Sequence, residues 1–360
     1  MSERKITIKD IAEKAKVSTG TVDRVIHKRG RVSPDVEERV LKILQKMDYE
    51  PNFIARALGS KKQVAVAALV PDGQYDVYWT DPFEGIKRAE RDLKQYGVNV
   101  KFFLFNQFDA ASFVQQAKLL TDSEPDGIIV SPVFYREVMP FFKIWKDRKI
   151  PFVLFNTQIS DIYPLCYVGQ DSYQSGMLAA RLVHTSMPEA GAVLIVHFDE
   201  DISNAFHLKQ KESGFRNYFV QNQLDDYRLM KEDMNGEDYS LFKAQMDKII
   251  DHNPFLKFIY VTTSKAYKIA TYLKERRIND IKIIGYDLVP QNIKFLQSGG
   301  ITFLINQNAK GQGFWSLQLI SEHLVLKKDI PMMKYLPLDI IVKENVNYFT
   351  GEDTDFTDMS

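Results

Sequence analysis

The chain has 360 residues, of which 45% are apolar and 12% aromatic, and this is enough material for more than one hydrophobic core. One cysteine, Cys166, excludes an internal disulfide framework, and six histidines without a CxxC or HExxH pattern argue against a zinc site, so we expect neither metal nor cofactor. No run approaches the roughly 18 apolar residues of a membrane helix, and the N-terminus lacks the apolar core of a signal peptide. We therefore expect a cytoplasmic protein without membrane contact.

The formal net charge of zero hides an uneven distribution along the chain. Residues 1–62 contain 15 Lys and Arg against 9 Asp and Glu, so the remaining residues carry a matching acidic excess. A basic segment on an acidic body favours contact of that segment with a polyanion. Chance clustering of basic residues on a solvated helical surface explains the charge alone equally well.

Three short helices are predicted in residues 1–50. Thr7 followed by Asp10 predicts the first helix N-terminus. Ser18 caps the second helix, and Ser33 before Pro34 opens the third. The apolar residues at helical spacing are Ile8, Ile11, Ala12 and Ala15, then Val22, Val25 and Ile26, then Val36, Val40, Leu41, Leu44 and Met47. Two helices joined by a turn of about three residues indicate a helix-turn-helix.

Residues 51–63 read as a short linker with helical potential, and the pattern changes after them. Apolar runs of about five to seven residues then alternate with helical stretches; the runs are VAVAALV, VKFFLF, DGIIVSP, IPFVLFN, AVLIVHF, FIYVTT and IKIIGYD. Strands that are apolar on both faces and alternate with helices indicate a doubly wound α/β architecture with parallel sheets. The length favours two such sheets with a cleft between them, beyond the carboxyl ends of the strands. Residues 351–360 are predicted to be a disordered acidic tail.

A specific series of motifs runs through the chain: ITIKDIAEKAKVSTGTVDRVI, RVSPDVEERVLKILQKMDYEPNFIARAL and the later DGIIVSP and IIGYD. Together they resemble the LacI/GalR (lactose-repressor-type) family of transcription regulators, from residue 6 to about residue 348. The resemblance implies a helix-turn-helix DNA-binding domain (1–50), a hinge helix (51–63) and a two-lobed effector and dimerisation domain (64–350). That last domain is expected to resemble type 1 periplasmic binding proteins. Lobe 1 is expected at about 64–168 and 306–335, and lobe 2 at about 169–305 and 336–350.

The resemblance implies that the second helix, Ser18 to Ile26, enters the major groove of operator DNA. Small residues there let the helix N-terminus approach the base edges, and Arg24 reaches a guanine or a phosphate. The implied DNA-binding residues are Thr7, Ser18, Thr19, Gly20, Thr21, Arg24, His27, Ser33, Asn52, Ala55 and Leu58.

Two groups among these residues have an alternative interpretation. Thr7, Ser18 and Ser33 match positions that contact phosphates, but helix capping alone also explains them. Leu58 matches the leucine that a hinge helix inserts into the minor groove at the centre of the operator. The alternative is that Leu58 packs on the body as an ordinary linker residue.

Two residues depart from the family pattern in the DNA-binding segment. Lys16 stands where the family usually has Gly in the turn, and a left-handed lysine costs roughly 1 kcal/mol. Asp23 stands where Ser is usual before the helix arginine. A carboxylate is repelled by phosphates, so Asp23 either pairs with a cation or accepts from a cytosine amine. The operator sequence therefore cannot be carried over from other members.

Aromatic and polar residues at strand ends make up the candidate effector site. Counting back from Gly85 places Asp76, Val77, Tyr78 and Trp79 where the family has Asn-Pro-Phe-Phe, whose aromatics line the cleft and stack on a sugar ring. Carboxylates and amides bind sugar hydroxyls, and Asp287 matches the acid that faces the ligand in the family. The implied effector-binding residues are Asp76, Tyr78, Trp79, Asn156, Gln158, Asp171, Lys211, Thr263, Asp287 and Gln307.

The effector residues also depart from the family in two places. Lys211 replaces the usual Arg, which removes the bidentate geometry of a guanidinium, and Thr263-Ser264 replace the usual Asn-Asp. Core packing is the alternative interpretation for Tyr78 and Trp79. Effector identity therefore does not follow from the resemblance.

Three classes of function are compatible with these patterns. We expect a sequence-specific regulator of carbohydrate metabolism, a repressor, that binds a pseudo-palindromic operator as a homodimer under control of a sugar or sugar derivative. A sugar-binding protein of the same fold that does not bind DNA is the alternative, but it would not carry the basic helical segment. An enzyme is the third class, and the sequence contains no nucleophile-base set, phosphate loop or metal cluster that would support it.

Overall fold

The computed structural model describes residues 8–26, 30, 32–46, 63–159, 162–198, 205–236 and 238–350. The chain divides into two compact units, Met1–Lys61 and Lys62–Ser360. Several residues of the sequence predictions lie outside the described ranges: Thr7, His27, Met47, Asn52, Ala55, Leu58 and the tail 351–360.

The described part of the first unit consists of three helices, α1 (Ile8–Ala15), α2 (Thr19–Ile26) and α3 (Pro34–Lys46). Their shared core contains Ile11, Ala12, Ala15, Val22, Val25 and Val40. The Ser18 hydroxyl accepts a hydrogen bond from the backbone N–H of Thr21 at 3.1 Å, so the predicted N-cap is confirmed. Pro34 is the first residue of α3, as predicted.

Two details of this unit bear on the sequence predictions. Lys16 has φ 52°, so it occupies the left-handed region that usually favours glycine. The inclusion of Leu41 in the apolar stripe of α3 was wrong, because its side chain is 50% exposed. Residues spaced by three and four from Val36 and Val40 share a face, and Ile43 therefore packs on the core instead.

Lobe 1 of the second unit is a six-stranded sheet in the order β11-β5-β4-β3-β1-β2. Its elements are β1 (Val64–Pro71), η1 (Val77–Trp79), α5 (Thr80–Leu93), η2 (Lys94–Tyr96), β2 (Val98–Phe105), α6 (Ala110–Asp122), β3 (Gly127–Val130), α7 (Tyr135–Asp147), β4 (Phe152–Phe155), β5 (Cys166–Gly169), α13 (Ala309–Leu326) and β11 (Met333–Tyr335). All its strand pairs are parallel. Each of the strands β3, β4 and β5 has four residues, and all of them are buried, as expected for strands covered on both faces.

Lobe 2 is a second six-stranded sheet in the order β12-β10-β9-β8-β6-β7. Its elements are α8 (Ser172–Ser186), β6 (Ala192–Phe198), α9 (Phe206–Gln221), β7 (Arg228–Met234), α10 (Tyr239–His252), β8 (Leu256–Val261), α11 (Ala266–Arg276), β9 (Lys282–Tyr286), α12 (Pro290–Gln297), β10 (Phe303–Asn306), β12 (Asp339–Ile341) and α14 (Asn347–Thr350). Only β12, which pairs with β10, is antiparallel among the strand pairs described for this sheet.

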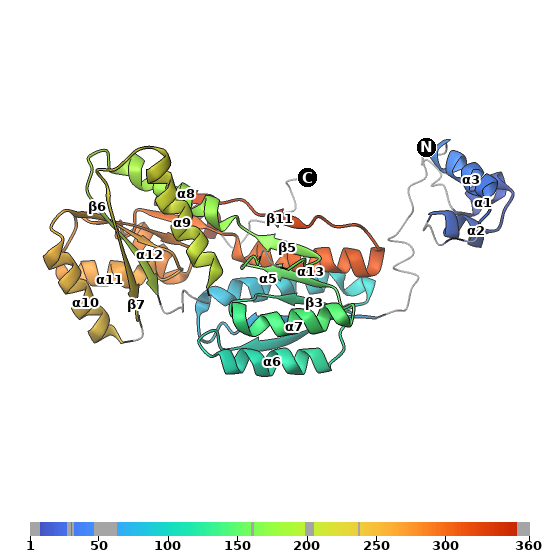
Figure 1. Cartoon of the computed structure of the whole chain (residues 1–360), viewed down its shortest axis with the longest axis horizontal. Helices are drawn as coiled ribbons and strands as arrows, with labels where there is room; N and C mark the ends of the chain where they lie inside the picture. The colour runs from blue at the N-terminus through green and yellow to red at the C-terminus, as the bar shows by residue number, and fades with distance from the viewer. Residues whose placement is uncertain are drawn as a thin grey trace. The chain divides into compact units, whose positions relative to one another are not determined.

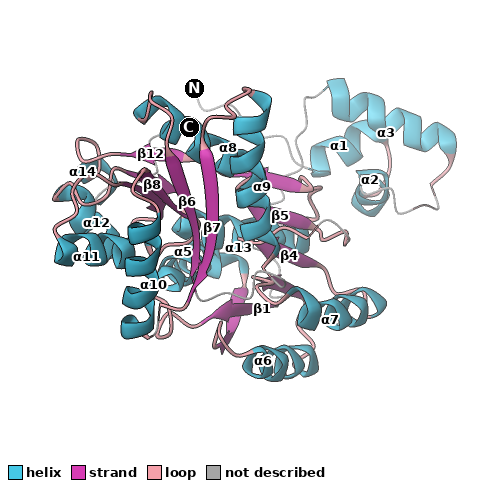
Figure 2. Ribbon diagram, turned by 60° about the vertical axis from the view of Figure 1, so that its left-hand side comes forward, coloured by secondary structure: helices cyan, strands magenta, loops and turns pink. Residues whose placement is uncertain are grey.

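The two sheets form separate groups of strands in Figure 2. The chain passes between the lobes after β5, after β10 and between β11 and β12. The predicted fold class, a helix-turn-helix segment followed by two doubly wound parallel-sheet lobes, is confirmed.

Each lobe contains a pair of helices in unusually close contact. In Figure 1 α13 lies beside α5 in lobe 1, and α8 lies beside α9 in lobe 2. A Cβ at Gly85 of α5 would meet the Lys310 carbonyl oxygen at 1.9 Å, and one at Gly176 of α8 would meet that of Lys211 at 2.0 Å. Glycine is therefore needed at both crossing points, and the second one fixes the backbone at Lys211.

Candidate functional site

The exposed face of α2 carries small and basic residues. Ser18, Thr19, Gly20 and Arg24 are exposed and Thr21 is partly exposed, whereas Val22 and Val25 of the same helix face the core. A helix with small side chains at its N-terminus and an exposed guanidinium has the shape and charge that fit a DNA groove.

The N-terminus of α3 is a second polar position in this unit. Ser33 is exposed, and its backbone carbonyl accepts from the N–H groups of Val36 and Glu37. Its side chain hydrogen-bonds the Asp35 carboxylate, which lowers the pKa of that exposed group.

In the second unit, a set of polar residues lies where the strand ends of the two lobes face each other. We call this set the inter-lobe cluster; it contains Asp76, Tyr78 and Asn156 of lobe 1, Lys211, Thr263 and Asp287 of lobe 2, and Gln307 at a crossover.

Tyr78 and Trp79 form the aromatic part on the lobe 1 side. Both are buried in η1, with their rings edge-to-face and 4.9 Å apart. The Asn156 side-chain amide donates to the Tyr78 hydroxyl at 2.7 Å. Burial raises the pKa of the Tyr78 hydroxyl well above its usual value, and the carboxylate of Asp287 raises it further. Tyr78 is thus a neutral group within electrostatic reach of lobe 2.

Asp76 holds several groups at this edge of lobe 1. One carboxylate oxygen caps η1 by accepting from the Tyr78 N–H at 3.0 Å, and the other accepts from the Gln107 amide at 2.9 Å. Gln107 in turn accepts from the Trp79 indole N–H. Lys265 of lobe 2 places its ammonium 3.9 Å from the same carboxylate, so Asp76 also forms an ion pair between the lobes.

Asp287 is the central acid on the lobe 2 side. Its side chain is almost entirely buried, with φ 66° at the end of β9, and its Oδ2 accepts from the Gln307 amide at 2.7 Å. Its Oδ1 is buried with no hydrogen-bond partner among the described residues. Burial raises the pKa of Asp287 to about 7, although the Lys211 ammonium and the Gln307 hydrogen bond oppose this rise.

Lys211 and Thr263 flank Asp287. Lys211 is 2% exposed; its ammonium donates to the Thr262 carbonyl at 3.0 Å and lies 3.7 Å from the centre of the Tyr286 ring. The Thr263 hydroxyl is buried, again with no hydrogen-bond partner in the described part of the chain. Two polar atoms of lobe 2 thus retain unused hydrogen-bonding capacity, which is costly unless a further molecule uses it.

Comparison with known proteins supports the same division of the chain. Residues 7–52 match the family described as "Bacterial regulatory proteins, lacI family", and residues 66–328 match the family described as "Periplasmic binding protein domain". The HTH-type transcriptional regulator pepR1 of Lactobacillus delbrueckii subsp. lactis is 35% identical over 241 residues, covering 67% of this chain and 68% of that protein. The chain belongs to the LacI family.

One further relative matches nearly the whole chain, and two solved structures match about four fifths of it. The ribose operon repressor of Halalkalibacterium halodurans is 24% identical over 94% of this chain and 96% of that protein. A crystal structure of a LacI transcriptional regulator from Bacteroides fragilis has a TM-score of 0.74 at 28% identity, covering 80% of this chain and 99% of that one. A glucose-galactose binding protein from Geobacillus stearothermophilus shares the fold, with a TM-score of 0.70 at 23% identity over 79% and 99% of the two chains.

As a LacI-family member, the chain is a DNA-binding transcriptional regulator. Members of its family are transcriptional regulators and sugar-binding proteins, not enzymes. Its described residues contain no group of His, Cys, Asp and Glu arranged to hold a metal ion. No helix within these residues is long and apolar enough to cross a membrane.

Two predicted effector residues lie apart from the contacts around Asp287. Asp171 accepts from the Gln174 N–H at 3.0 Å and is the N-cap of α8, so capping accounts for its carboxylate. Gln158 places its amide 3.7 Å from the Met333 sulfur, beside the edge strand β11. The other predicted residues, except Trp79 behind Tyr78, belong to the inter-lobe cluster.

Sequence reasoning missed several residues that contact or flank this cluster. Gln107 and Lys265 connect to Asp76, and Thr157 of lobe 1 hydrogen-bonds His207 of lobe 2 at 3.3 Å. Burial, reinforced by Lys211, lowers the pKa of His207 to about 3 and keeps its ring neutral. Gln107, Thr157 and Lys265 all follow strands, and the rule that found Asn156 also applies to them; His207 lies in α9 and carried no such signal.

Proposed function

We propose that this LacI-family regulator is a cytoplasmic repressor of a carbohydrate-metabolism operon, and that a sugar or sugar derivative binds the inter-lobe cluster to control it. The observation that supports this proposal most is that two polar atoms of the inter-lobe cluster, Asp287 Oδ1 and Thr263 Oγ1, are buried without hydrogen-bond partners among the described residues. The names of three relatives, the ribose operon repressor, the regulator MalR and the sucrose operon repressor, support a sugar as the effector.

Sugars fit this cluster for a chemical reason. Their hydroxyl groups donate to carboxylate oxygens, which Asp287 offers at Oδ1, and they both donate to and accept from a threonine hydroxyl. Their C–H faces pack on aromatic rings such as Tyr78. A hydroxyl group that reaches Asp287 would also favour the charged form of this acid, whose pKa is raised to about 7 by burial.

Control of DNA binding would act through the placement of the lobes. The lobes contact each other through the Asp76–Lys265 ion pair and the Thr157–His207 hydrogen bond, and a ligand between them would change these contacts. In a homodimer this change would alter the spacing of the two helix-turn-helix units on a pseudo-palindromic operator. A coupling free energy of about 1–3 kcal/mol would change operator affinity roughly 5–150-fold.

The decisive experiment measures binding of the full chain to its own upstream DNA at several salt concentrations, with and without a panel of mono- and disaccharides. We expect binding that depends on the DNA sequence and is weakened by one sugar of the panel. Sequence-independent binding would contradict the proposal, because phosphate contacts alone produce it along with a steep salt dependence.

Two variants separate the DNA-binding role from the sensing role. Arg24→Ala should weaken operator binding by roughly 1–3 kcal/mol if the guanidinium reads a base; unchanged affinity would reject that role. Asp287→Ala should abolish the sugar response and leave sugar-free operator binding intact. Loss of operator binding in this second variant would instead indicate a role in folding.

A further inference from the structure

A buried histidine lies behind the inter-lobe cluster. His197 stands near the end of β6, in the otherwise apolar run AVLIVHF, and its side chain is 1% exposed. A polar ring in such a place costs free energy unless its nitrogens are hydrogen-bonded, so its partners show what it connects.

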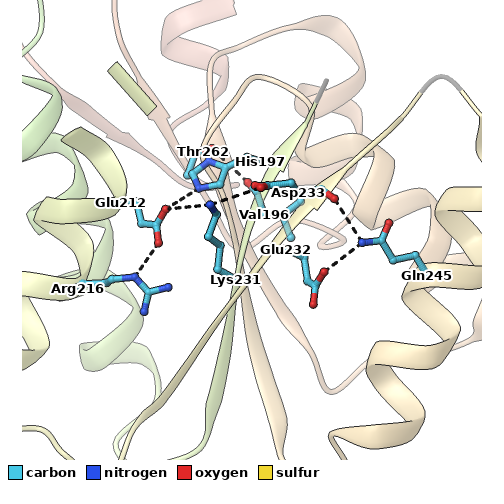
Figure 3. A network of polar contacts seen from close by, with 9 residues as sticks. All are labelled: Val196, His197, Glu212, Arg216, Lys231, Glu232, Asp233, Gln245 and Thr262. Carbon is cyan, nitrogen blue, oxygen red and sulfur yellow. Dashed lines mark hydrogen bonds and ion pairs between the residues drawn. The ribbon is translucent and has the colours of Figure 1, made fainter. Parts of the chain in front are cut away.

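Both ring nitrogens of His197 have a partner, and the partners belong to different elements. Nδ1 lies 2.7 Å from the Thr262 hydroxyl, directly after β8, and Nε2 lies 3.0 Å from a Glu212 carboxylate oxygen in α9. Figure 3 shows the ring between these two side chains. His197 therefore bridges the end of β8 and helix α9.

Glu212 is held as a carboxylate by several groups. Arg216 Nε donates to its second oxygen at 2.7 Å, and the Lys231 ammonium lies 3.9 Å away (Figure 3). The hydrogen bond from His197 and that from Arg216 lower the pKa of Glu212 to about 2. A carboxylate only accepts hydrogen bonds, so Nε2 of His197 carries a proton and donates.

Thr262 connects this bridge to the inter-lobe cluster. Its carbonyl oxygen accepts from the Lys211 ammonium at 3.0 Å, and Thr263, with its buried hydroxyl, is the next residue. Lys211 and Glu212 are neighbours in α9, so this helix reaches Thr262 twice, once directly and once through His197. Two separate links give the lysine side chain and the threonine loop a fixed separation.

We propose that His197 is a positioning residue: by holding Glu212 to Thr262 it places the Lys211 ammonium over the Tyr286 ring and orients Thr263 in the inter-lobe cluster. The relevance of this placement to effector binding rests on the proposed function. The placement itself is a property of the ligand-free chain, and it is tested without ligand or DNA.

The competing explanation is that His197 only fills space in lobe 2. A leucine at this position has a similar volume, and replacement of a buried polar group by an apolar one of like shape is often tolerated. Stability alone therefore does not separate the two explanations. The position of the Lys211 side chain does, because ring currents of Tyr286 shift the signals of a side chain held 3.7 Å from its centre.

The experiment is NMR of the ligand-free full chain labelled with [ε-13C]lysine, with the Lys211 signal assigned by its loss in Lys211→Met. His197→Leu removes both hydrogen bonds. His197→Asn places an amide near Nδ1, and His197→Gln places one near Nε2, so each retains a group for one partner. His184→Leu is the matched control, because it removes a histidine–hydroxyl contact of the same lobe, the 3.1 Å contact with Tyr218.

We expect an upfield-shifted Lys211 signal in the wild type, loss of at least half of that shift in His197→Leu, intermediate positions in the two amide variants and no change in His184→Leu. A wild-type Lys211 signal in His197→Leu would overturn the proposal, whatever the melting temperature of the variant. An equal change in His184→Leu would overturn it too, because general loosening of lobe 2 would then suffice. If His197→Leu does not fold, the same comparison is made with His197→Asn and His197→Gln.

A functional measurement then addresses the effector. For any sugar that releases the wild-type protein from DNA, His197→Leu should raise the required concentration about 10-fold, the typical effect of a misplaced charged hydrogen-bond donor. Sugar-free operator affinity should stay at the wild-type value. A failure of the proposed function would remove this release but leave the NMR result unaffected.

Discussion

The two lobes share one strand order, with a parallel edge strand β11 in lobe 1 and an antiparallel edge strand β12 in lobe 2, and they differ in the polar groups that they present to each other. Their strand orders, β11-β5-β4-β3-β1-β2 and β12-β10-β9-β8-β6-β7, are equivalent position by position. In lobe 1 the Tyr78 hydroxyl and the Asp76 carboxylate both have partners from their own lobe. In lobe 2 Asp287 and Thr263 each retain a buried oxygen with no partner within the described residues.

This difference assigns distinct physical roles to two similar sheets. The topology brings polar strand ends together, but hydrogen bonding decides which of them are available to another molecule. In lobe 1 the polar groups of the inter-lobe cluster hold each other in place, and the buried polar atoms of this lobe without partners among the described residues lie outside the cluster, at Ser131, Gln312 and Ser321. In lobe 2 the unused buried atoms belong to the cluster itself, so a ligand there can offset their free-energy cost.

The largest expected effect concerns the acid of lobe 2. The folded-state pKa of Asp287, about 7, lies above the ordinary value, so the folded chain retains a proton between about pH 4 and pH 7 that the unfolded chain has lost. This group therefore lowers stability as the pH rises through that window. In Asp287→Asn this pH-dependent loss of stability should disappear. The difference in the free energy of unfolding between the variant and wild type should therefore grow by up to about 1.4 kcal/mol for each pH unit across the window. Urea unfolding at several pH values measures it.

Asp226→Asn is the control for that measurement, because it removes an exposed carboxylate of the same lobe. It should reproduce the wild-type pH dependence. If the free energies of unfolding of Asp287→Asn and wild type differ by the same amount at every pH in the window, Asp287 is not desolvated in the folded chain.

The next effect tests whether the lobes are equivalent in their helix packing. Gly85→Ala in lobe 1 and Gly176→Ala in lobe 2 each force a Cβ against a backbone carbonyl, at 1.9 and 2.0 Å. Each should destabilise the chain by about 1–3 kcal/mol, since neither carbonyl can move without shifting its helix. Gly191→Ala should cost less, because its Cβ first meets the flexible Lys257 side chain at 3.2 Å. Thermal unfolding compares the three variants. Equal losses of stability in all three would mean that the backbone contacts at Gly85 and Gly176 are no more restrictive than the side-chain contact at Gly191.

The smallest effects should have opposite signs in the two lobes. Tyr78→Phe leaves the Asn156 amide without its 2.7 Å acceptor and should cost about 1 kcal/mol of stability. Thr263→Val removes a buried hydroxyl that has no partner in the described ranges, and should leave stability equal or up to about 1 kcal/mol higher. Destabilisation by both variants, seen in urea unfolding, would contradict the contrast between the lobes.

Local patterns predicted most of the fold and part of the candidate site. The apolar runs predicted the parallel strands, because strands buried on both faces need no alternation. Polar residues directly after such runs, Asn156 and Asp287 among them, were predicted since parallel strands end at one edge. The left-handed Lys16 follows from its place in a turn where glycine is usual.

Contacts between separate segments were not predictable in the same way. The Asp76–Lys265 and Thr157–His207 contacts depend on how two lobes meet, which no local pattern of residues encodes. The role of Asp171 as a helix cap and the exposure of Leu41 depend on the exact start and phase of a helix. The sequence thus indicated candidate residues, whereas their hydrogen bonds and ion pairs required the three-dimensional structure.

The position of α13 in the chain has a consequence for synthesis on the ribosome. This helix packs against α5 and the strands β3, β4 and β5, and its Leu317 and Ile320 belong to the core of lobe 1, yet it ends at Leu326. When the first 300 residues have been made, lobe 1 still exposes the apolar surface that α13 will cover. Nascent chains of that length therefore expose an apolar surface to which chaperones can bind and through which the chains can aggregate.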